Sequence, residues 1–274
     1  MEFIGNIITQ AFDMALLPFS NLSPLWGLLT VSIVTGVIMV LIFKHTSNQA
    51  AIRNTKDKIS AYFLEVRLFK DDLGLMLEAQ KKILRSTLTY MRYSVTPMFV
   101  MIVPVVLIMA QLGIRYSHRP LKPGESAVVK LKLAGARSVE DVPVLVENAD
   151  GLQVETPLLR ISGKREIDFR IRALTQGEHV LSVQVEDEYV RIPVMAAGTI
   201  QRVYPVRRHS SLTETLLSPG QSPLPENSRL EETGINYPAH AIKVLGFNAN
   251  WLVIFFVGSI IAGYLLKGVF KVDL

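Results

Sequence analysis

The chain has 274 residues, of which 49% are hydrophobic, and it carries a formal net charge of +5 and no cysteine. The absence of cysteine excludes disulfide bonds, thiolate metal sites and lipid anchors on cysteine. A mean hydropathy of +0.31 is higher than soluble domains of this length usually reach. We therefore expect long apolar helices together with soluble parts.

Three uncharged apolar runs, separated by very unequal gaps, divide the chain. They cover residues 24–43, 93–114 and 244–266, which are 20, 22 and 23 residues long. At a rise of about 1.5 Å per residue, a helix of each length crosses a hydrocarbon core of roughly 30 Å. The sequence therefore predicts an α-helical membrane protein with three transmembrane helices, TM1 (24–43), TM2 (93–114) and TM3 (244–266).

Residues 1–23, which precede TM1, contain Glu2 and Asp13 but neither lysine nor arginine. Apolar side chains recur mostly every three to four residues between Phe3 and Leu17. This spacing predicts an amphipathic helix at a membrane surface. An N-terminal extension of TM1 is an equally good interpretation.

The segment between TM1 and TM2, residues 44–92, has ten basic and five acidic residues. Apolar side chains in steps of four and three predict a coiled-coil hairpin with helices over 48–69 and 72–92. Asp71 or Asp72 is expected to cap the second helix, and a single longer helix is the alternative. The basic face of the hairpin consists of Lys56, Lys58, Arg67, Lys70, Lys81, Lys82 and Arg85.

The distribution of charge predicts the orientation in the membrane. Short loops rich in lysine and arginine stay in the cytoplasm, so the ten basic residues of 44–92 place the hairpin there. The acidic N-terminus and the segment between TM2 and TM3 then lie outside, and the tail 267–274 returns to the cytoplasm. We expect a multi-pass protein of the inner (cytoplasmic) membrane.

Residues 115–208 have the pattern of an all-β domain. Apolar and polar side chains alternate in short runs such as AVVKLKL (127–133) and HVLSVQV (179–185), and turn pairs such as Pro123-Gly124 separate the runs. Strands at this spacing predict an extracytoplasmic immunoglobulin-like sandwich. Residues 209–243, which are rich in proline, glycine and serine, predict a mostly irregular linker to TM3.

The sequence contains no arrangement typical of an active site. The five histidines have no metal-ligand spacing, and no phosphate-binding, nucleophile-elbow or zinc-protease motif occurs. No carboxylate lies within the three runs, which leaves no carrier for a proton relay. The basic residues of the hairpin alternate with acidic and apolar ones, which disfavours sequence-specific nucleic-acid binding. We therefore expect neither an enzyme nor a cofactor or metal site.

Polar side chains within the runs suggest a recess open to the cytoplasm. Its expected lining residues are Thr30, Ser32, Thr35, Ser94, Thr96, Ser259 and Tyr264. Three cations, Lys44, Arg92 and Lys267, lie at its cytoplasmic mouth. In the alternative interpretation, the hydroxyls bond to carbonyls of their own helix and the cations anchor the helices at the interface. The small pairs Ser32/Gly36 and Ser259/Gly263 also indicate close packing of TM1 against TM3.

The order of these parts, together with three sequence segments, resembles the YidC/Oxa/Alb superfamily of membrane protein insertases. The segments are FDMALLPFSNLSPLWGLL (12–29), KDKISAYFLEVRLFKDDLGLMLEAQKKILRSTLTYMRYSVTP (56–97) and MFVMIVPVVLIMAQL (98–112). In that superfamily too, a basic hairpin leads into a span that begins near a proline and contains an IP or VP step. Here these are Pro97 and Val103-Pro104. The match is with the minimal three-span members, to which this chain adds a β domain, and it implies insertion of membrane proteins without a cofactor.

Two functions follow from these observations. The first is a membrane protein insertase or intramembrane chaperone, whose hairpin captures a client membrane protein or a ribosome and whose recess admits a polar segment into the bilayer. The alternative is a non-catalytic membrane-anchored assembly or scaffold protein whose β domain binds a periplasmic partner. Exchange of the β domain would abolish the second function and preserve the first.

Overall fold

The computed structural model describes residues 2–19, 22–135, 138–147, 149–211, 214, 218–244, 246–270 and 272. Its helices are α1 (Glu2–Leu16), η1 (Leu17–Phe19), α2 (Pro24–Thr46), α3 (Gln49–Leu68), α4 (Leu73–Tyr116) and α6 (Trp251–Leu266). Its strands are β1 (Ser126–Leu133), β2 (Val144–Val146), β3 (Leu152–Val154), β4 (Leu159–Ile161), β5 (Glu166–Ala173), β6 (Gly177–Val185), β7 (Glu188–Ala196), β8 (Val206–Arg208), β9 (Leu230–Ile235), β10 (Ile242–Val244) and β11 (Phe247–Ala249). The chain forms two compact units, the β unit (residues 1–27 and 107–251) and the helical unit (28–106 and 252–274).

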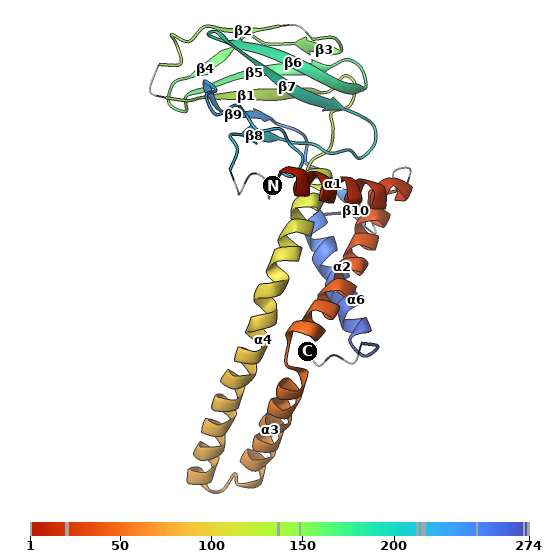
Figure 1. The fold of residues 1–274 in the computed structure, drawn as a ribbon, viewed down its shortest axis with the longest axis vertical. Coiled ribbons are helices and arrows are strands. Elements are labelled where there is room, and N and C mark those ends of the chain that lie inside the picture. Colours follow the sequence, from red (N-terminus) through yellow and green to blue (C-terminus); the bar gives the residue numbers. More distant parts are fainter. Residues whose placement is uncertain are drawn as a thin grey trace. The chain divides into compact units, whose positions relative to one another are not determined.

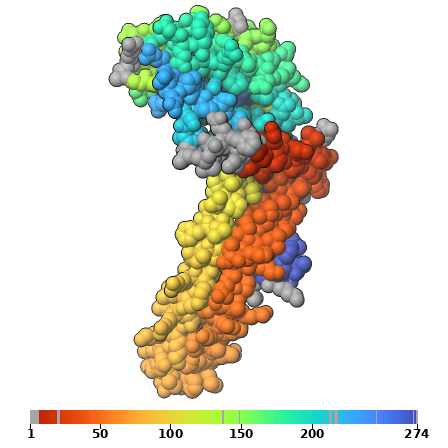
Figure 2. Space-filling model, viewed as in Figure 1, coloured from red at the N-terminus to blue at the C-terminus, as the bar shows by residue number. Residues whose placement is uncertain are grey.

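Helices α3 and α4 form an antiparallel hairpin in the helical unit and lie side by side along its length (Figures 1 and 2). The side chain of Asn48 caps α3, because it accepts a hydrogen bond from the backbone N–H of Ala51 at 3.0 Å. Asp72 caps α4 in the same way, with the N–H groups of Gly74 and Leu75 at 2.9 and 3.1 Å. The break lies where the sequence predicted it, and the second of the two candidate aspartates is the cap.

Helix α4 is a single helix of 44 residues. The predicted second hairpin helix (72–92) and TM2 (93–114) are therefore one continuous element. Pro97 and Pro104 lie inside it. Because proline lacks an N–H, the carbonyls four residues earlier lose their helical hydrogen-bond donor at two places in this helix.

Helices α2 and α4 are the helices within the described residues that are long and apolar enough to cross a membrane. Helix α6 has 16 residues, which correspond to a length of about 24 Å against a hydrocarbon core of about 30 Å. The predicted TM3 helix (244–266) begins later than expected because Ile242–Val244 (β10) pairs with Phe247–Ala249 (β11) as an antiparallel hairpin. Gly246 lies at its turn with a φ of +89°, a conformation that glycine adopts readily. The predicted helix is therefore wrong over Val244 and over residues 246–250, which precede α6.

Helices α2 and α6 pack closely through small residues. A β-carbon added at Gly36 of α2 would lie 2.6 Å from the carbonyl oxygen of Ser259 and 2.9 Å from the β-carbon of Ala262. A β-carbon added at Gly258 would lie 3.0 Å from that of Ser32. Close packing of the first apolar run against the third is thus confirmed.

Antiparallel strands of the β unit form two sheets around one core (Figure 1). One sheet has the order β3-β5-β1-β9-β8, with β4 also paired to β5, and the other has the order β2-β6-β7. The inward side chains of both sheets, Leu131, Phe169, Val183 and Ile192 among them, belong to one hydrophobic cluster. Burial of every second side chain explains why the alternating runs form strands. The predicted antiparallel β domain is confirmed, and its immunoglobulin-like class stays a prediction.

Strand β9 lies within the segment 209–243, for which the sequence predicted an irregular linker. It pairs with β1 and with β8, so it is an integral strand of the larger sheet. The β1–β9 register shifts between Lys132 and Leu133, a bulge that interrupts the alternation of side chains. Glu231 bonds to the ammonium of Lys132 at 3.0 Å, and Glu232 bonds to Arg208 at 2.8 Å. The linker prediction is therefore corrected over this strand.

Candidate functional site

The two most central residues of the predicted recess, Ser32 and Thr35, are buried in the helical unit. Their hydroxyls donate to carbonyls of their own helix, Ser32 to Leu28 and Thr35 to Val31, each at 2.7 Å. Ser32 also lies against Gly258, so it belongs to the α2–α6 contact. Both hydroxyls thus adopt the ordinary arrangement that the sequence left open as the alternative.

The other predicted lining residues lie in different surroundings. Thr30, Thr96 and Tyr264 are exposed, whereas Ser94 and Ser259 are half-buried. The hydroxyl of Ser259 donates to the carbonyl of Phe256 at 3.0 Å. The structure therefore brings Ser32 and Ser259 to the α2–α6 contact and leaves the three exposed residues on outer surfaces.

The three cations predicted at the recess mouth come from three different segments of the helical unit. Lys44 lies in the last turn of α2 and Arg92 in the middle of α4, and both side chains are exposed. The ammonium of Lys267 lies 3.7 Å from the ring centroid of Tyr264, which is a cation–π contact. These positions suit residues that anchor helices at an interface.

The predicted basic face of the hairpin is mostly solvated. Six of its seven side chains are exposed: Lys56, Lys58, Arg67, Lys70, Lys81 and Arg85. The seventh, Lys82, bonds to Glu65 on α3 and to Glu78 on its own helix, each at 3.2 Å. The hydrogen bond that the Lys82 ammonium donates to Glu65, followed by the one that it donates to Glu78, raises the pKa of Lys82. Lys82 therefore ties the two hairpin helices together at their surface.

The end of the hairpin carries a cluster of exposed apolar side chains, which we name the apolar tip. It consists of Phe63, Leu64, Leu68, Phe69, Leu73 and Leu77. Leu64 and Leu68 are 67% and 75% exposed. The apolar steps of four and three that predict the hairpin run through Phe69 and Leu73, which they place at the seam between the two helices. The same steps say nothing of the apolar residues between the seam positions, so the sequence pattern did not reveal the tip.

The buried guanidinium of Arg115 is the centre of a hydrogen-bond network at the end of α4 that belongs to the β unit. The side chain of Arg115 is only 4% exposed. It donates to the backbone carbonyl and the side-chain oxygen of Gln111, each at 2.7 Å, and to the carbonyl of Thr9 at 3.2 Å. It also forms an ion pair of 2.5 Å with Asp13 on α1. The amide of Gln111 completes the network by donating to the hydroxyl of Thr9 at 2.9 Å.

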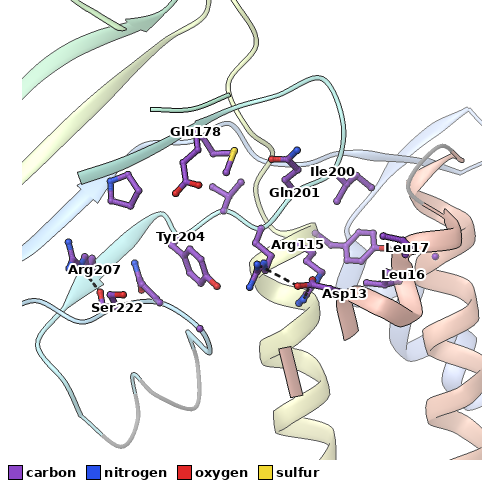
Figure 3. Close-up of a pocket in the computed structure, with 18 of the residues that line it drawn as sticks. Asp13, Leu16, Leu17, Arg115, Glu178, Ile200, Gln201, Tyr204, Arg207 and Ser222 are labelled. Carbon is purple, nitrogen blue, oxygen red and sulfur yellow. Dashed lines mark hydrogen bonds and ion pairs between the residues drawn. The ribbon is translucent and has the colours of Figure 1, made fainter. Parts of the chain in front are cut away.

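This network borders a cavity of about 670 Å³ within the β unit. One wall consists of the outward side chains of β6 and β7, namely Glu178, Val180, Arg191, Pro193 and Met195. Another wall comes from the end of α1, from η1 and from the start of α2, and it contains Asp13, Leu16, Leu17, Phe19 and Pro24. The lining is completed by Gly27, Arg115, Tyr116, residues 200–204, Arg207 and residues 220–222. Figure 3 shows Tyr204 and Arg207 on one side of the cavity and Asp13, Leu16 and Leu17 on the other.

The sequence-based reasoning missed Arg115 because a cation at the end of an apolar run usually marks the membrane interface. The spacing of polar residues in the sequence nevertheless indicates this network. Gln111 and Arg115 are four residues apart, and so are Thr9 and Asp13. Polar pairs at this spacing share one helix face, so two otherwise apolar helices each presented a matching polar patch.

Within the described ranges, no group of three or more histidine, aspartate or glutamate side chains is placed to hold a metal ion.

Comparison with known proteins gives no family assignment. No family model matches the chain. The siderophore peptide synthetase fer3 of Mycosarcoma maydis is 31% identical over 124 residues, which are 44% of this chain and 2% of the synthetase. Domains 5–6 of the S-layer protein SbsC match 36% of this chain and 52% of that structure, at 16% identity and a TM-score of 0.21. A longer SbsC structure matches 34% of this chain and 13% of its own length, also at 16% identity and a TM-score of 0.21. The chain thus spans a small part of the synthetase and about half of the shorter structure.

Proposed function

We propose that this chain is an inner-membrane insertase or intramembrane chaperone that captures apolar segments of client membrane proteins on the apolar tip of its hairpin. The orientation is the one predicted from the charge of residues 44–92, with the hairpin in the cytoplasm. The observation that carries the proposal is the apolar tip itself. Soluble surfaces rarely expose such a cluster unless it binds something.

The size of the apolar tip suits reversible capture. Burial of one large apolar side chain contributes about 1.5–3 kcal/mol, so a client segment that covered four of them would gain roughly 6–12 kcal/mol. Association costs about 4–15 kcal/mol in lost freedom, which offsets most of this gain. Binding is therefore weak, and a client captured at the tip can be released to the bilayer.

Helix α4 provides a direct route from the tip to the membrane. The same unbroken helix carries Leu73 and Leu77 at the tip and, further along, a run of exposed apolar side chains that includes Phe99 and Val103. Between these regions, Pro97 removes one helical hydrogen bond and leaves a carbonyl without its usual donor. An unpaired carbonyl next to an apolar face attracts water, which would help a polar part of the client to pass.

The order of parts supports the same function, since a basic hairpin that leads into a proline-containing span resembles the YidC/Oxa/Alb superfamily. On this proposal the partners are the lipid bilayer and nascent or client membrane proteins, with the ribosome as a further candidate at the hairpin. Capture and release by burial need no catalytic group and no cofactor.

The test is insertion of a small single-span client into proteoliposomes that contain the purified chain. The variant Leu64→Ser/Leu68→Ser/Leu73→Ser removes three exposed leucines of the tip, and we expect it to lower insertion several-fold. The matched control Leu145→Ser/Leu159→Ser removes exposed leucines of the β unit and should leave insertion unchanged. Insertion no higher than in empty liposomes would refute the proposal, as would equal activity of the tip variant and the wild type.

A second experiment separates this function from that of a scaffold. Exchange of residues 121–237 for an unrelated domain removes most of the β unit. We expect insertion of the client to persist after the exchange. A loss of client assembly that is restored only by the original β domain would favour the scaffold instead.

A further inference from the structure

The cavity of the β unit contains more positive than negative charge. Its lining includes four arginines, Arg115, Arg191, Arg202 and Arg207, and two carboxylates, those of Asp13 and Glu178. Asp13 is shared between two guanidinium groups, Arg115 at 2.5 Å and Arg202 at 3.5 Å. Because the buried Arg115 holds the closer oxygen, Arg202 is only partly neutralised. Its side chain remains 41% exposed.

Arg207 is held in place without a carboxylate. Its guanidinium donates to the backbone carbonyls of Ser222 at 2.6 Å, Arg191 at 2.8 Å and Pro223 at 2.9 Å. No ion pair joins it to any carboxylate of the described residues. Burial lowers its pKa, yet a guanidinium stays protonated in proteins, so the charge is present. Carbonyl groups orient the side chain, and they leave its charge available to an anion.

Arg191 adds a third cation to the lining of the cavity. It lies on β7, where it alternates with the buried Ile192, and its side chain is exposed. Its backbone carbonyl is one of the three that position Arg207. Arg191 and Arg207 are thus coupled through one hydrogen bond, and with Arg202 they give the lining its excess of positive charge.

The opposite wall is apolar apart from Asp13, whose carboxylate is paired with Arg115 and Arg202. Leu16, Leu17, Phe19 and Pro24 line it at the point where α2, the first helix able to cross a membrane, begins. A soluble anion would gain nothing from such a wall. An anion that carries hydrocarbon chains would pack these chains against the apolar wall and form ion pairs with the arginines.

We propose that this cavity binds an anionic phospholipid, with the phosphate group on Arg191, Arg202 and Arg207 and the acyl chains along Leu16 and Leu17. A volume of about 670 Å³ is large enough for a headgroup and the first part of its chains. The inference rests on the membrane placement in the proposed function, but it does not need insertion activity. The β unit is then held to the outer leaflet by a bound lipid.

The test measures lipid retained by the purified full chain after its release from nanodiscs of phosphatidylcholine with a minor fraction of phosphatidylglycerol. Native mass spectrometry counts the lipids. We expect phosphatidylglycerol to be retained in preference to phosphatidylcholine, and retention to fall about tenfold in Arg191→Gln/Arg202→Gln, which corresponds to about 1.4 kcal/mol. The variant Ile200→Trp, which places bulk in the cavity lining, should reduce retention without a change in charge.

The matched control is Arg170→Gln/Lys164→Gln, which removes two exposed cations of the β unit that are not part of the cavity lining. It should retain the lipid as the wild type does, and circular dichroism should show that all variants are folded. Equal retention in the cavity variant and the control would overturn the proposal. So would equal retention of the two lipids.

Two competition experiments identify the source of the anion. Glycerol phosphate and a soluble acidic peptide are added separately before the release. We expect neither to displace the lipid. Displacement by glycerol phosphate would show a site for free phosphate compounds, and displacement by the peptide would show a protein-binding site. A chain that retains phosphatidylglycerol but inserts no client would refute the proposed function alone.

Discussion

Replacement of Arg115 by methionine should destabilise the β unit more than any substitution of an exposed arginine. The guanidinium makes four hydrogen bonds, two to Gln111, one to the carbonyl of Thr9 and one to Asp13. Hydrogen bonds to a charged group contribute about 1.5–3 kcal/mol each when measured singly, and they are not additive. Methionine has a similar length and no donor, so these acceptors lose the hydrogen bonds of the guanidinium.

The expected loss of stability in the methionine variant depends on how exposed the side chains of Arg115 and Asp13 are. Loss of one member of a fully buried ion pair costs about 3–5 kcal/mol. Here Arg115 is buried, but the side chain of Asp13 is 39% exposed, so water and Arg202 can stabilise the carboxylate that remains. We therefore expect a loss of about 2–4 kcal/mol, which corresponds to a fall in Tm of roughly 4–16 °C for a unit of this size. Arg115→Lys, which can reach fewer of the acceptors, should lie between the wild type and the methionine variant.

The assay is thermal unfolding of the purified chain in detergent, followed by circular dichroism of the β signal. A double-mutant cycle with Asp13→Asn should give a coupling energy of about 1–2 kcal/mol between the two side chains. Arg170→Met is the control, because this exposed arginine should change the stability by no more than about 0.5 kcal/mol. A Tm of Arg115→Met equal to that of the control, or a coupling energy of zero, would show that the network is not structural.

Three further predictions concern other parts of the chain. Gly36→Leu should destabilise the helical unit by about 1–3 kcal/mol, measured by thermal unfolding, because even its β-carbon would lie 2.6 Å from the backbone of α6. Asp72→Ala should lower the stability of the hairpin by about 0.5–2 kcal/mol through loss of the cap of α4, whereas Asp71→Ala should not. The hydrogen bond and charge of Arg119 lower the pKa of Glu125, so this pair stabilises the β unit above about pH 4.5 and loses its effect as the pH falls through the lowered value. Glu125→Gln should therefore lower the Tm at neutral pH and have less effect at about pH 3.

Each of these predictions has an outcome that contradicts it. Gly268→Ala, where nothing lies near an added β-carbon, is the control for Gly36, and equal Tm changes for both positions would refute close packing. Equal losses for the two aspartate variants would show that neither acts as a cap. A Tm difference between Glu125→Gln and the wild type that stays constant from neutral to acid pH would exclude the ion pair as its cause.

The helical elements followed from the sequence because their signals are local. A run of uncharged residues, a period of three to four and an aspartate before the second hairpin helix are all visible in short windows. The strands around residues 127–133 and 179–185 could be predicted for the same reason. Apolar and polar residues alternate in their sequence, and alternate side chains are buried in the structure.

The missed elements depend on partners that are distant in the sequence. Strand β9 has two consecutive glutamates where it faces the bulge of β1, so its alternation is broken, and proline-rich segments around it suggested a linker. Its pairing partner, β1, lies about a hundred residues earlier. The network of Arg115 joins α4 to α1 across a similar separation. A pattern within a short window of sequence does not predict such contacts. For the Arg115 network, the one indication in the sequence is the four-residue spacing that Gln111/Arg115 and Thr9/Asp13 share.

The contrast between two surfaces of the helical unit leads to a last prediction about the path of a client. The α2–α6 contact is closed, since Gly36 has no room for a β-carbon, Gly258 has little, and Ser32 is fully buried there. On α4, by contrast, Phe99 and Val103 are 68% and 62% exposed. A photo-crosslinker at Val103 should therefore capture a client during its insertion, and one at Ser32 should not. The opposite result would mean that α2 and α6 separate during insertion and that the polar recess predicted from the sequence, not the surface of α4, accepts the client.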